Sequence, residues 1–156
     1  KSPEYWLTDV SGIPFGMMSE MLQDGGNPYR GMLYGMTARE PMESVPSQLW
    51  KVWDAFGIKD SRMMGYWVSY NPVKTGRNDV LATSFVKDGK VMIAIASWAK
   101  KDSDIKLQID WEKLGIDADK ARLTAPDIKG FQEGFSLSPK DKIKVPKDKG
   151  FIFILE

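Results

Sequence analysis

Cysteine and histidine are both absent from the 156 residues of this chain. Without cysteine there is no disulfide, no zinc thiolate site, no iron–sulfur cluster and no thiol nucleophile. Without histidine the chain cannot assemble a Ser-His-Asp triad, an imidazole metal ligand or a histidine general base. Any catalysis would depend on carboxylate, lysine, arginine or tyrosine side chains, and we expect neither a metal nor a cofactor.

Long apolar runs and an excess of one charge are missing too. No run approaches the ~18–20 apolar residues that a membrane span needs. Lys plus Arg (22) nearly equal Asp plus Glu (21), giving a net charge of +1, which argues against a nucleic-acid binder. The first residues lack a signal-peptide pattern and an initiating methionine, so we expect a piece excised from a longer protein.

The composition changes near residue 64. Eight of the nine methionines lie in the first 64 residues, and residues 1–58 carry 4 basic and 7 acidic side chains. Residues 59–156 carry 18 basic and 14 acidic side chains. We therefore predict a helical and loop segment over residues 1–60 and an antiparallel β-sandwich domain over residues 61–156.

Helical spacing is confined to the first segment. It predicts one helix over Phe15–Leu22 and a stronger one over Pro46–Phe56, which Gly57 should end. Tyr29–Arg39 has no clean period and is interpreted as a loop with one helical turn. We expect the second helix to pack both Trp50 and Trp53 onto the sandwich.

From about Met64 the apolar pattern has a period of two. Val80–Val86 and Val91–Trp98 form a predicted hairpin around Asp88-Gly89. Apolar residues on both faces of Met92–Ala96 indicate a central strand. Further strands are expected over 105–111, 121–125, 129–135, 142–145 and 151–155. The fold class is therefore mainly β: an antiparallel β-sandwich of the Greek-key type preceded by a short helical, Met- and Gly-rich N-terminal segment. Its core should include Phe85, Ile93, Ile95, Leu107, Ile109 and Phe153.

Asp110 and Glu112 are the closest carboxylates beside an aromatic residue. On a strand they would share a face at a separation of ~6.5–7 Å, near the range for an inverting glycosidase. Asp110 also precedes a short helical turn that Gly115 would close, which favours an N-cap. We prefer the N-cap.

The stretch Gly25–Arg30 is glycine-rich but lacks a Gly-Lys-Ser/Thr ending, so it is not a phosphate loop. We interpret it as a shaped loop that presents Asn27, Tyr29 and Arg30. Loops of this kind often bind ligands, but a purely structural turn is the favoured interpretation here. Among the aromatic residues, Trp67 and Tyr70 are the candidates for exposed positions, although core burial is favoured for them as well.

A family resemblance is carried by several stretches of the chain. They are Leu49–Ile58 followed by Met64-Gly65-Tyr66-Trp67, then Gly89–Trp98, Ile109-Asp110-Trp111 and the closing Lys149–Leu155. Together they resemble the C-terminal portion of bacterial glycoside hydrolase-like proteins, in which a (β/α)8 barrel is followed by an antiparallel β-sandwich. The resemblance covers nearly the whole chain and implies the end of a barrel followed by a non-catalytic accessory domain.

In such enzymes the catalytic carboxylates lie at the ends of barrel strands, so the resemblance implies no catalytic residue in this chain. It places the loop at Gly25–Arg30 near the barrel mouth, and the substrate-side candidates are Asp24, Asn27, Tyr29, Arg30, Arg39 and Trp67. The implied partner is the upstream catalytic barrel of the same polypeptide, with carbohydrate as ligand, in an extracytoplasmic setting. A free-standing carbohydrate-binding module using exposed aromatics is the alternative, and a small independent glycosidase ranks third.

The methionines of the first segment agree with the resemblance to the end of a barrel. We expect Met17, Met18, Met21, Met32 and Met36 to form an exposed apolar patch that would face the barrel. Self-association through this Met-rich segment is the other way in which the patch could be covered.

Overall fold

A hairpin of two eight-residue strands forms the centre of the fold. The computed structural model describes residues 2–5, 27–36 and 46–156, and within these β3 (Val80–Lys87) pairs with β4 (Lys90–Ser97) along its whole length. The two strands meet at Gly89, whose φ of 73° is the left-handed conformation that a tight hairpin turn requires. The hairpin predicted around Asp88-Gly89 is confirmed.

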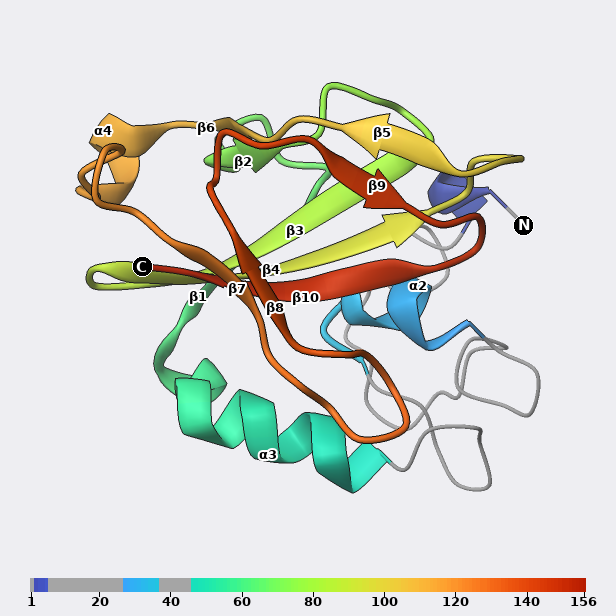
Figure 1. Cartoon of the computed structure of the whole chain (residues 1–156), viewed down its shortest axis with the longest axis horizontal. Coiled ribbons are helices and arrows are strands. Elements are labelled where there is room, and N and C mark those ends of the chain that lie inside the picture. Colours follow the sequence, from blue (N-terminus) through green and yellow to red (C-terminus); the bar gives the residue numbers. More distant parts are fainter. Residues whose placement is uncertain (1, 6–26, 37–45) are drawn as a thin grey trace.

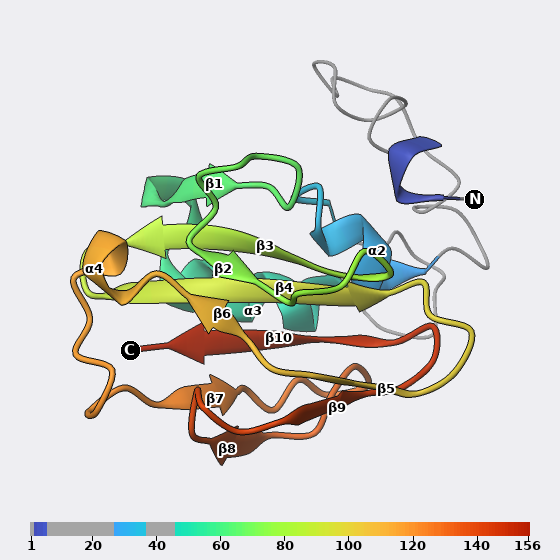
Figure 2. The same ribbon diagram turned by 90° about the horizontal axis from the view of Figure 1, so that it is seen from above.

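Four more strands extend the hairpin into a six-stranded antiparallel sheet in the order β1-β3-β4-β10-β7-β8 (Figure 2). They are β1 (Arg62–Met64), β10 (Gly150–Leu155), β7 (Leu123–Ala125) and β8 (Phe135–Leu137). Strand β10 begins at Gly150, where a Cβ atom would overlap the carbonyl oxygen of Ile95. Glycine is therefore needed to bring the last strand against the central one.

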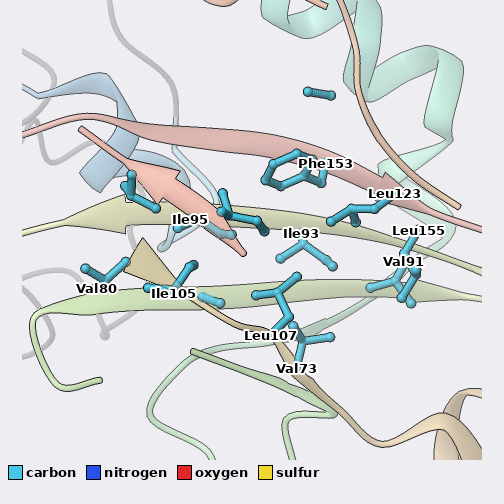
Figure 3. Packing of buried hydrophobic residues seen from close by; sticks show 14 of the residues in the cluster. Val73, Val80, Val91, Ile93, Ile95, Ile105, Leu107, Leu123, Phe153 and Leu155 are labelled. Atoms are coloured by element: carbon cyan, nitrogen blue, oxygen red, sulfur yellow. The ribbon is translucent and has the colours of Figure 1, made fainter. Parts of the chain in front are cut away.

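Two short ribbons form the opposing layer. One pairs β2 (Val73–Lys74) with β6 (Gln108–Ile109), and the other pairs β5 (Ser103–Ile105) with β9 (Ile143–Val145). Figure 1 shows both ribbons on one side of the sheet. The side chains of the ribbons pack against those of the sheet and form a buried hydrophobic core (Figure 3). This core includes Val73, Ile93, Ile95, Ile105, Leu107 and Phe153. The predicted mainly β, antiparallel sandwich is confirmed.

Helices cover the other face of the sheet (Figure 1). They are α2 (Pro28–Met32) and α3 (Pro46–Phe56), and the 3-10 helix η2 (Ile58–Asp60) follows α3. Between helices and sheet lies a second core, which includes Met32, Leu33, Leu49, Phe56, Phe85, Met92, Ala94 and Ile152. Strand β4 is thus buried on both faces, as the sequence predicts.

Two strand predictions are wrong in detail. The run 105–111 is not one strand, because β5 and β6 pair with different partners and Trp111 begins α4 (Trp111–Leu114). The run 129–135 is not a strand either. Gly130, with a φ of 75°, turns the chain back, and β8 begins only at Phe135.

Three expectations about burial also need correction. Trp50 is 48% exposed, because it lies about 100° around the helix from the buried Leu49. Met32 has no exposed surface, since α2 presses it onto the sheet. Ile109 is only half-buried at the edge of its ribbon. The predicted helix at Phe15–Leu22 and the methionines Met17, Met18 and Met21 lie outside the described residues.

Candidate functional site

Helix α2 lies within residues 27–36 and packs against the sheet. Asn27 caps it, since its side-chain Oδ1 accepts a hydrogen bond of 3.2 Å from the Arg30 amide. Pro28 occupies the first turn, where its missing N–H costs nothing. The short helix buries Tyr29 and Met32 and directs Arg30 toward the end of β4.

Arg30 fastens this helix to two other parts of the chain. Its guanidinium donates to the Ser97 carbonyl through both Nε (3.2 Å) and a terminal nitrogen (3.1 Å), and to the Asp148 carboxylate at 2.8 Å. The same group lies 4.7 Å above the ring of Trp98. Asn27 donates to the Asp148 carbonyl at 2.7 Å. We call these five residues the Arg30 clasp.

The electrostatics of the clasp reflect partial burial. Burial lowers the pKa of the Arg30 guanidinium from its ordinary value, while the charge and hydrogen bond of Asp148 raise it. Only 18% of the Arg30 side chain is exposed, whereas its partner carboxylate is 52% exposed. Asp148 adopts a φ of 56°, which aspartate tolerates better than most residues.

Tyr29 occupies the neighbouring position on the sheet. Its hydroxyl donates to the carbonyl of Phe131 at 3.0 Å, and the two rings stack at a centroid distance of 4.7 Å. Only 9% of Tyr29 is exposed, and burial raises the pKa of its hydroxyl. The ring is therefore packed within the protein instead of being presented to a ligand.

Thr83 joins the turn after α2 to the middle of the central hairpin. Its hydroxyl is fully buried, donates to the Leu33 carbonyl at 2.8 Å and accepts from the Tyr66 amide at 3.3 Å. Leu33 itself has no exposed surface. A polar residue in the middle of a buried strand is explained here by its pairing with a carbonyl from outside the sheet.

Two phenols meet at the carbonyl of Pro3. The hydroxyls of Tyr34 and Tyr66 each lie 3.1 Å from that oxygen and 3.1 Å from each other. Two phenols carry two protons, so at any moment two of these three contacts are hydrogen bonds. Burial raises the pKa of both tyrosines. The neutral phenols thus hold residues 2–5 on the loop that follows β1.

Trp67 lies beside this group and is 40% exposed. Its ring is nearly parallel to that of Tyr34, at a centroid distance of 5.9 Å, and meets Tyr66 edge-on at 5.1 Å. The indole also packs back over Gly65, where any Cβ would overlap it. Tyr70 is 49% exposed, with Arg62 above its ring. Both side chains are exposed, whereas core burial was the favoured interpretation from the sequence.

A cleft of about 190 Å³ opens next to this loop, at the part of β3 that β1 does not reach. Its polar groups complete the strand edge. Asn71 donates to the Ala82 carbonyl at 2.9 Å, and Thr75 donates to the Val80 carbonyl. The side chain of Arg77, at the rim, is paired with Asp79 at 2.7 Å. These groups serve the sheet, and nothing in their arrangement identifies a ligand.

Asp110, one of the two carboxylates considered for catalysis, has a structural role. Asp110 caps α4, accepting from the Lys113 amide at 3.0 Å, and Gly115 closes that helix with a φ of 63°. The preferred N-cap interpretation is confirmed. Within residues 2–5, 27–36 and 46–156, no group of three or more acidic side chains could hold a metal ion.

The predicted substrate-side residues do not gather in one place. Asn27 and Arg30 belong to the clasp at Asp148, Tyr29 packs on Phe131, and Trp67 stacks on Tyr34. Asp24 and Arg39 lie outside the described residues. What the structure brings together is a set of contacts between residues 2–5 and 27–36 on one side and the sheet on the other.

By its fold and these contacts, the protein is a β-sandwich domain to which a preceding stretch of the chain is joined by packing and hydrogen bonds. Comparison with protein families gives the family. Residues 45–156 match the glycoside hydrolase 123 C-terminal domain, and residues 1–41 match the glycoside hydrolase 123 TIM-barrel domain. The chain belongs to glycoside hydrolase family 123. The expected resemblance to a barrel followed by a sandwich is confirmed.

The two matches divide the contacts described above. Helix α2, the turn at Tyr34 and residues 2–5 fall in the stretch that matches the barrel, whereas α3 and all strands fall in the C-terminal domain. The predicted boundary near residue 60 stays a prediction. No curated protein matches the chain. None of the helices in the described ranges is long and apolar enough to cross a membrane.

Several contact residues were missed from sequence. Asp148 lies between β9 and β10, and nothing local links it to Arg30, 118 residues earlier. Tyr34 and Tyr66 are separated by 32 residues and show no shared pattern. Thr83 could have been noticed from sequence, because a threonine within a mostly apolar buried strand needs a hydrogen-bond partner.

Proposed function

We propose that the sandwich domain is a non-catalytic accessory domain that supports the catalytic barrel of a glycoside hydrolase, with the barrel in the same polypeptide. The observation that carries this proposal is the burial of Met32 and Leu33. Both match the barrel domain, and both lie in the core between α2 and the sheet with no exposed surface. Burying each such side chain stabilises the contact by about 1.5–3 kcal/mol.

The hydrogen bonds and the ion pair support the same role. The Arg30 clasp joins α2 to the end of β4 and to the turn before β10, and Thr83 holds the next turn at the Leu33 carbonyl. Apolar burial alone would allow α2 to slide along the sheet. Directional hydrogen bonds at both ends of the helix fix its position on the sheet.

A carbohydrate-binding module is the second candidate function. Its support is the exposure of Trp67 and Tyr70, because exposed aromatic rings can stack on apolar sugar faces. Part of the Trp67 ring is, however, already covered by Tyr34 and Gly65. The accessory role accounts for more of the contacts. The substrate-side roles of the six candidates stay predictions, as does an extracytoplasmic location; the candidates are Asp24, Asn27, Tyr29, Arg30, Arg39 and Trp67.

A binding experiment separates the two candidates. The chain of 156 residues should bind no sugar on a glycan array and should not hydrolyse aryl glycosides. Binding that Trp67→Ala abolishes, and that Phe135→Ala on the far edge strand preserves, would establish a binding module instead. Turnover of an aryl glycoside would favour an independent glycosidase.

Support of the barrel is tested in a polypeptide that joins this chain to a complete family 123 barrel. Arg30→Ala should shorten the half-life of glycosidase activity on heating. Arg77→Ala is the matched control, because it removes an equally short but exposed ion pair with Asp79. Equal half-lives for the two variants would argue against a supporting role for the clasp.

A further inference from the structure

We propose that the exposed surface formed by Tyr34, Gly35, Met63 and Trp67 is a docking surface for the TIM-barrel domain of the same polypeptide. We call these four residues the β1-edge patch. The proposal rests on the proposed accessory function and names the surface through which the barrel is supported, beyond the contacts made by α2.

The patch lies on an edge of the sheet that is open in the described residues. Strand β1 is the first in the strand order, and among the described residues it pairs with β3 (Figure 2). Met63 on this strand is 37% exposed, and Trp67 just after it is 40% exposed. An edge strand that exposes large apolar side chains is a site for unwanted pairing unless another part of the protein covers it.

The patch continues a contact that already exists. A Cβ atom on Gly35 would lie 3.7 Å from the Met63 sulfur, and the ring of Tyr34 stacks on Trp67. The Tyr34 hydroxyl in turn meets the carbonyl of Pro3 at 3.1 Å. Tyr34, Gly35 and Pro3 all match the barrel domain. The remaining exposed surface of Met63 and Trp67 therefore borders directly on barrel residues.

The chemistry of the patch suits a protein partner better than a sugar. Interface cores are enriched in aromatic residues and methionine and depleted in charge, and the patch contains no charged side chain. A sugar site also needs polar groups that orient the hydroxyls. The only side-chain polar groups of the patch are the Tyr34 hydroxyl, already engaged with Pro3 and Tyr66, and the Trp67 indole N–H.

The two stretches matched by the family models also differ in the sign of their net charge. Residues 1–41, which match the barrel, carry 3 basic and 5 acidic side chains, whereas residues 45–156 carry 19 basic and 15 acidic ones. The two parts thus have net charges of opposite sign, −2 and +4. Opposite net charges promote the approach of two surfaces, while apolar contact holds them together.

Hydroxyl-radical footprinting with mass spectrometry tests the proposal. The probe is applied to the chain of 156 residues and to a polypeptide that joins it to a complete family 123 barrel. We expect oxidation of Met63 and Trp67 to fall about fivefold or more in the joined polypeptide, because an interface core excludes solvent. Phe135 is the internal control. It is 39% exposed but lies on β8, at the opposite edge of the sheet, so its oxidation should not change.

A variant gives a second measurement. Met63→Asp should lower the unfolding temperature of the joined polypeptide, because docking would bury the new charge. The same change in the chain of 156 residues should have little effect, since the side chain is exposed there. Unchanged oxidation of Met63 and Trp67 on joining would overturn the docking surface and leave the test of the Arg30 clasp unaffected. Protection of Trp67 by added sugar in the chain of 156 residues would also overturn it.

Discussion

Replacing Thr83 by valine should destabilise the chain more than its small change in shape suggests. The hydroxyl of Thr83 donates to the Leu33 carbonyl at 2.8 Å and accepts from the Tyr66 amide at 3.3 Å. Valine has nearly the same shape but offers neither interaction. Thr83→Val therefore leaves a carbonyl and an amide without this partner at a position with no exposed surface.

The expected loss in the free energy of unfolding is about 2 kcal/mol. A buried polar group without a hydrogen-bond partner costs about 1–3 kcal/mol. Taken alone, the loss of a partner for both the Leu33 carbonyl and the Tyr66 amide would cost more than about 2 kcal/mol. The extra methyl group of valine returns part of this by burying about one more carbon, roughly 0.8 kcal/mol. Thr83→Ser keeps the hydroxyl and should retain the hydrogen bond while losing the methyl contact.

Urea unfolding followed by tryptophan fluorescence measures this loss as a shift of the midpoint at constant slope. Thr124→Val is the matched control, because its hydroxyl lies at an exposed position and faces only Ser136 at 3.2 Å. We expect the control to stay within about 0.5 kcal/mol of the parent chain. If Thr83→Val costs no more than Thr124→Val, the turn after α2 is not held on the sheet as described.

Three further predictions concern packing and pH. Leu33→Ala should cost about 2–5 kcal/mol in unfolding free energy, because the side chain is fully buried, and a loss below ~1 kcal/mol in urea unfolding would contradict that burial. Gly150→Ala should prevent or severely weaken pairing of β10 with β4, since its Cβ would overlap the Ile95 carbonyl, and a variant with the parent's circular dichroism and melting temperature would refute this. Burial raises the pKa of Tyr66 above its ordinary value of 10.0, so the neutral phenol stabilises the fold fully below pH 10, and this contribution is lost as the pH rises above 10. Tyr66→Phe should therefore flatten the fall in stability above pH 10 seen in thermal melts at a series of pH values, and an equally steep fall would contradict the assignment.

The strands of the sheet could be predicted where the sequence pattern is local. Asp88-Gly89 between two alternating runs specified the central hairpin, and apolar residues on both faces of Met92–Ala96 specified its central position. The alternation of Ile105 and Leu107 with polar residues was also real, since both are buried. It did not reveal that the hydrogen-bonding partner changes between them, because a period of two reports which face is buried and not which strand lies alongside.

Helix α3 shows a second limit. Its length and its end at Gly57 were predicted correctly, with Gly57 at a φ of 76°. The predicted apolar stripe is wider than the buried face of the helix. Leu49 and Phe56 face the core, whereas Trp50 lies to one side of them and is 48% exposed. The sequence alone does not show whether a tryptophan next to a buried leucine lies inside the buried stripe of the helix or outside it.

The candidate site depends on contacts between distant positions, which a single sequence does not reveal. Arg30 was selected as a residue that touches substrate, but its guanidinium is engaged with Ser97 and Asp148. Met32 was expected at an exposed surface for a barrel and instead fills the core beside the sheet, where a flexible thioether adapts to an irregular space. The substrate-side role of Arg30 stays a prediction, whereas the exposed position expected for Met32 is wrong.

Native-state hydrogen exchange of the amides after α2 tests the central claim most directly. In the chain of 156 residues the Leu33 amide donates to the Arg30 carbonyl at 3.3 Å and the Tyr34 amide to the Gly31 carbonyl at 3.0 Å. If the barrel-matching stretch is part of the core, these amides should exchange only through global unfolding, with the same opening free energy as the Ile93 and Ile95 amides of β4. Exchange of Leu33 and Tyr34 that is orders of magnitude faster, while β4 stays protected, would contradict the account and separate α2 from the domain it is said to join.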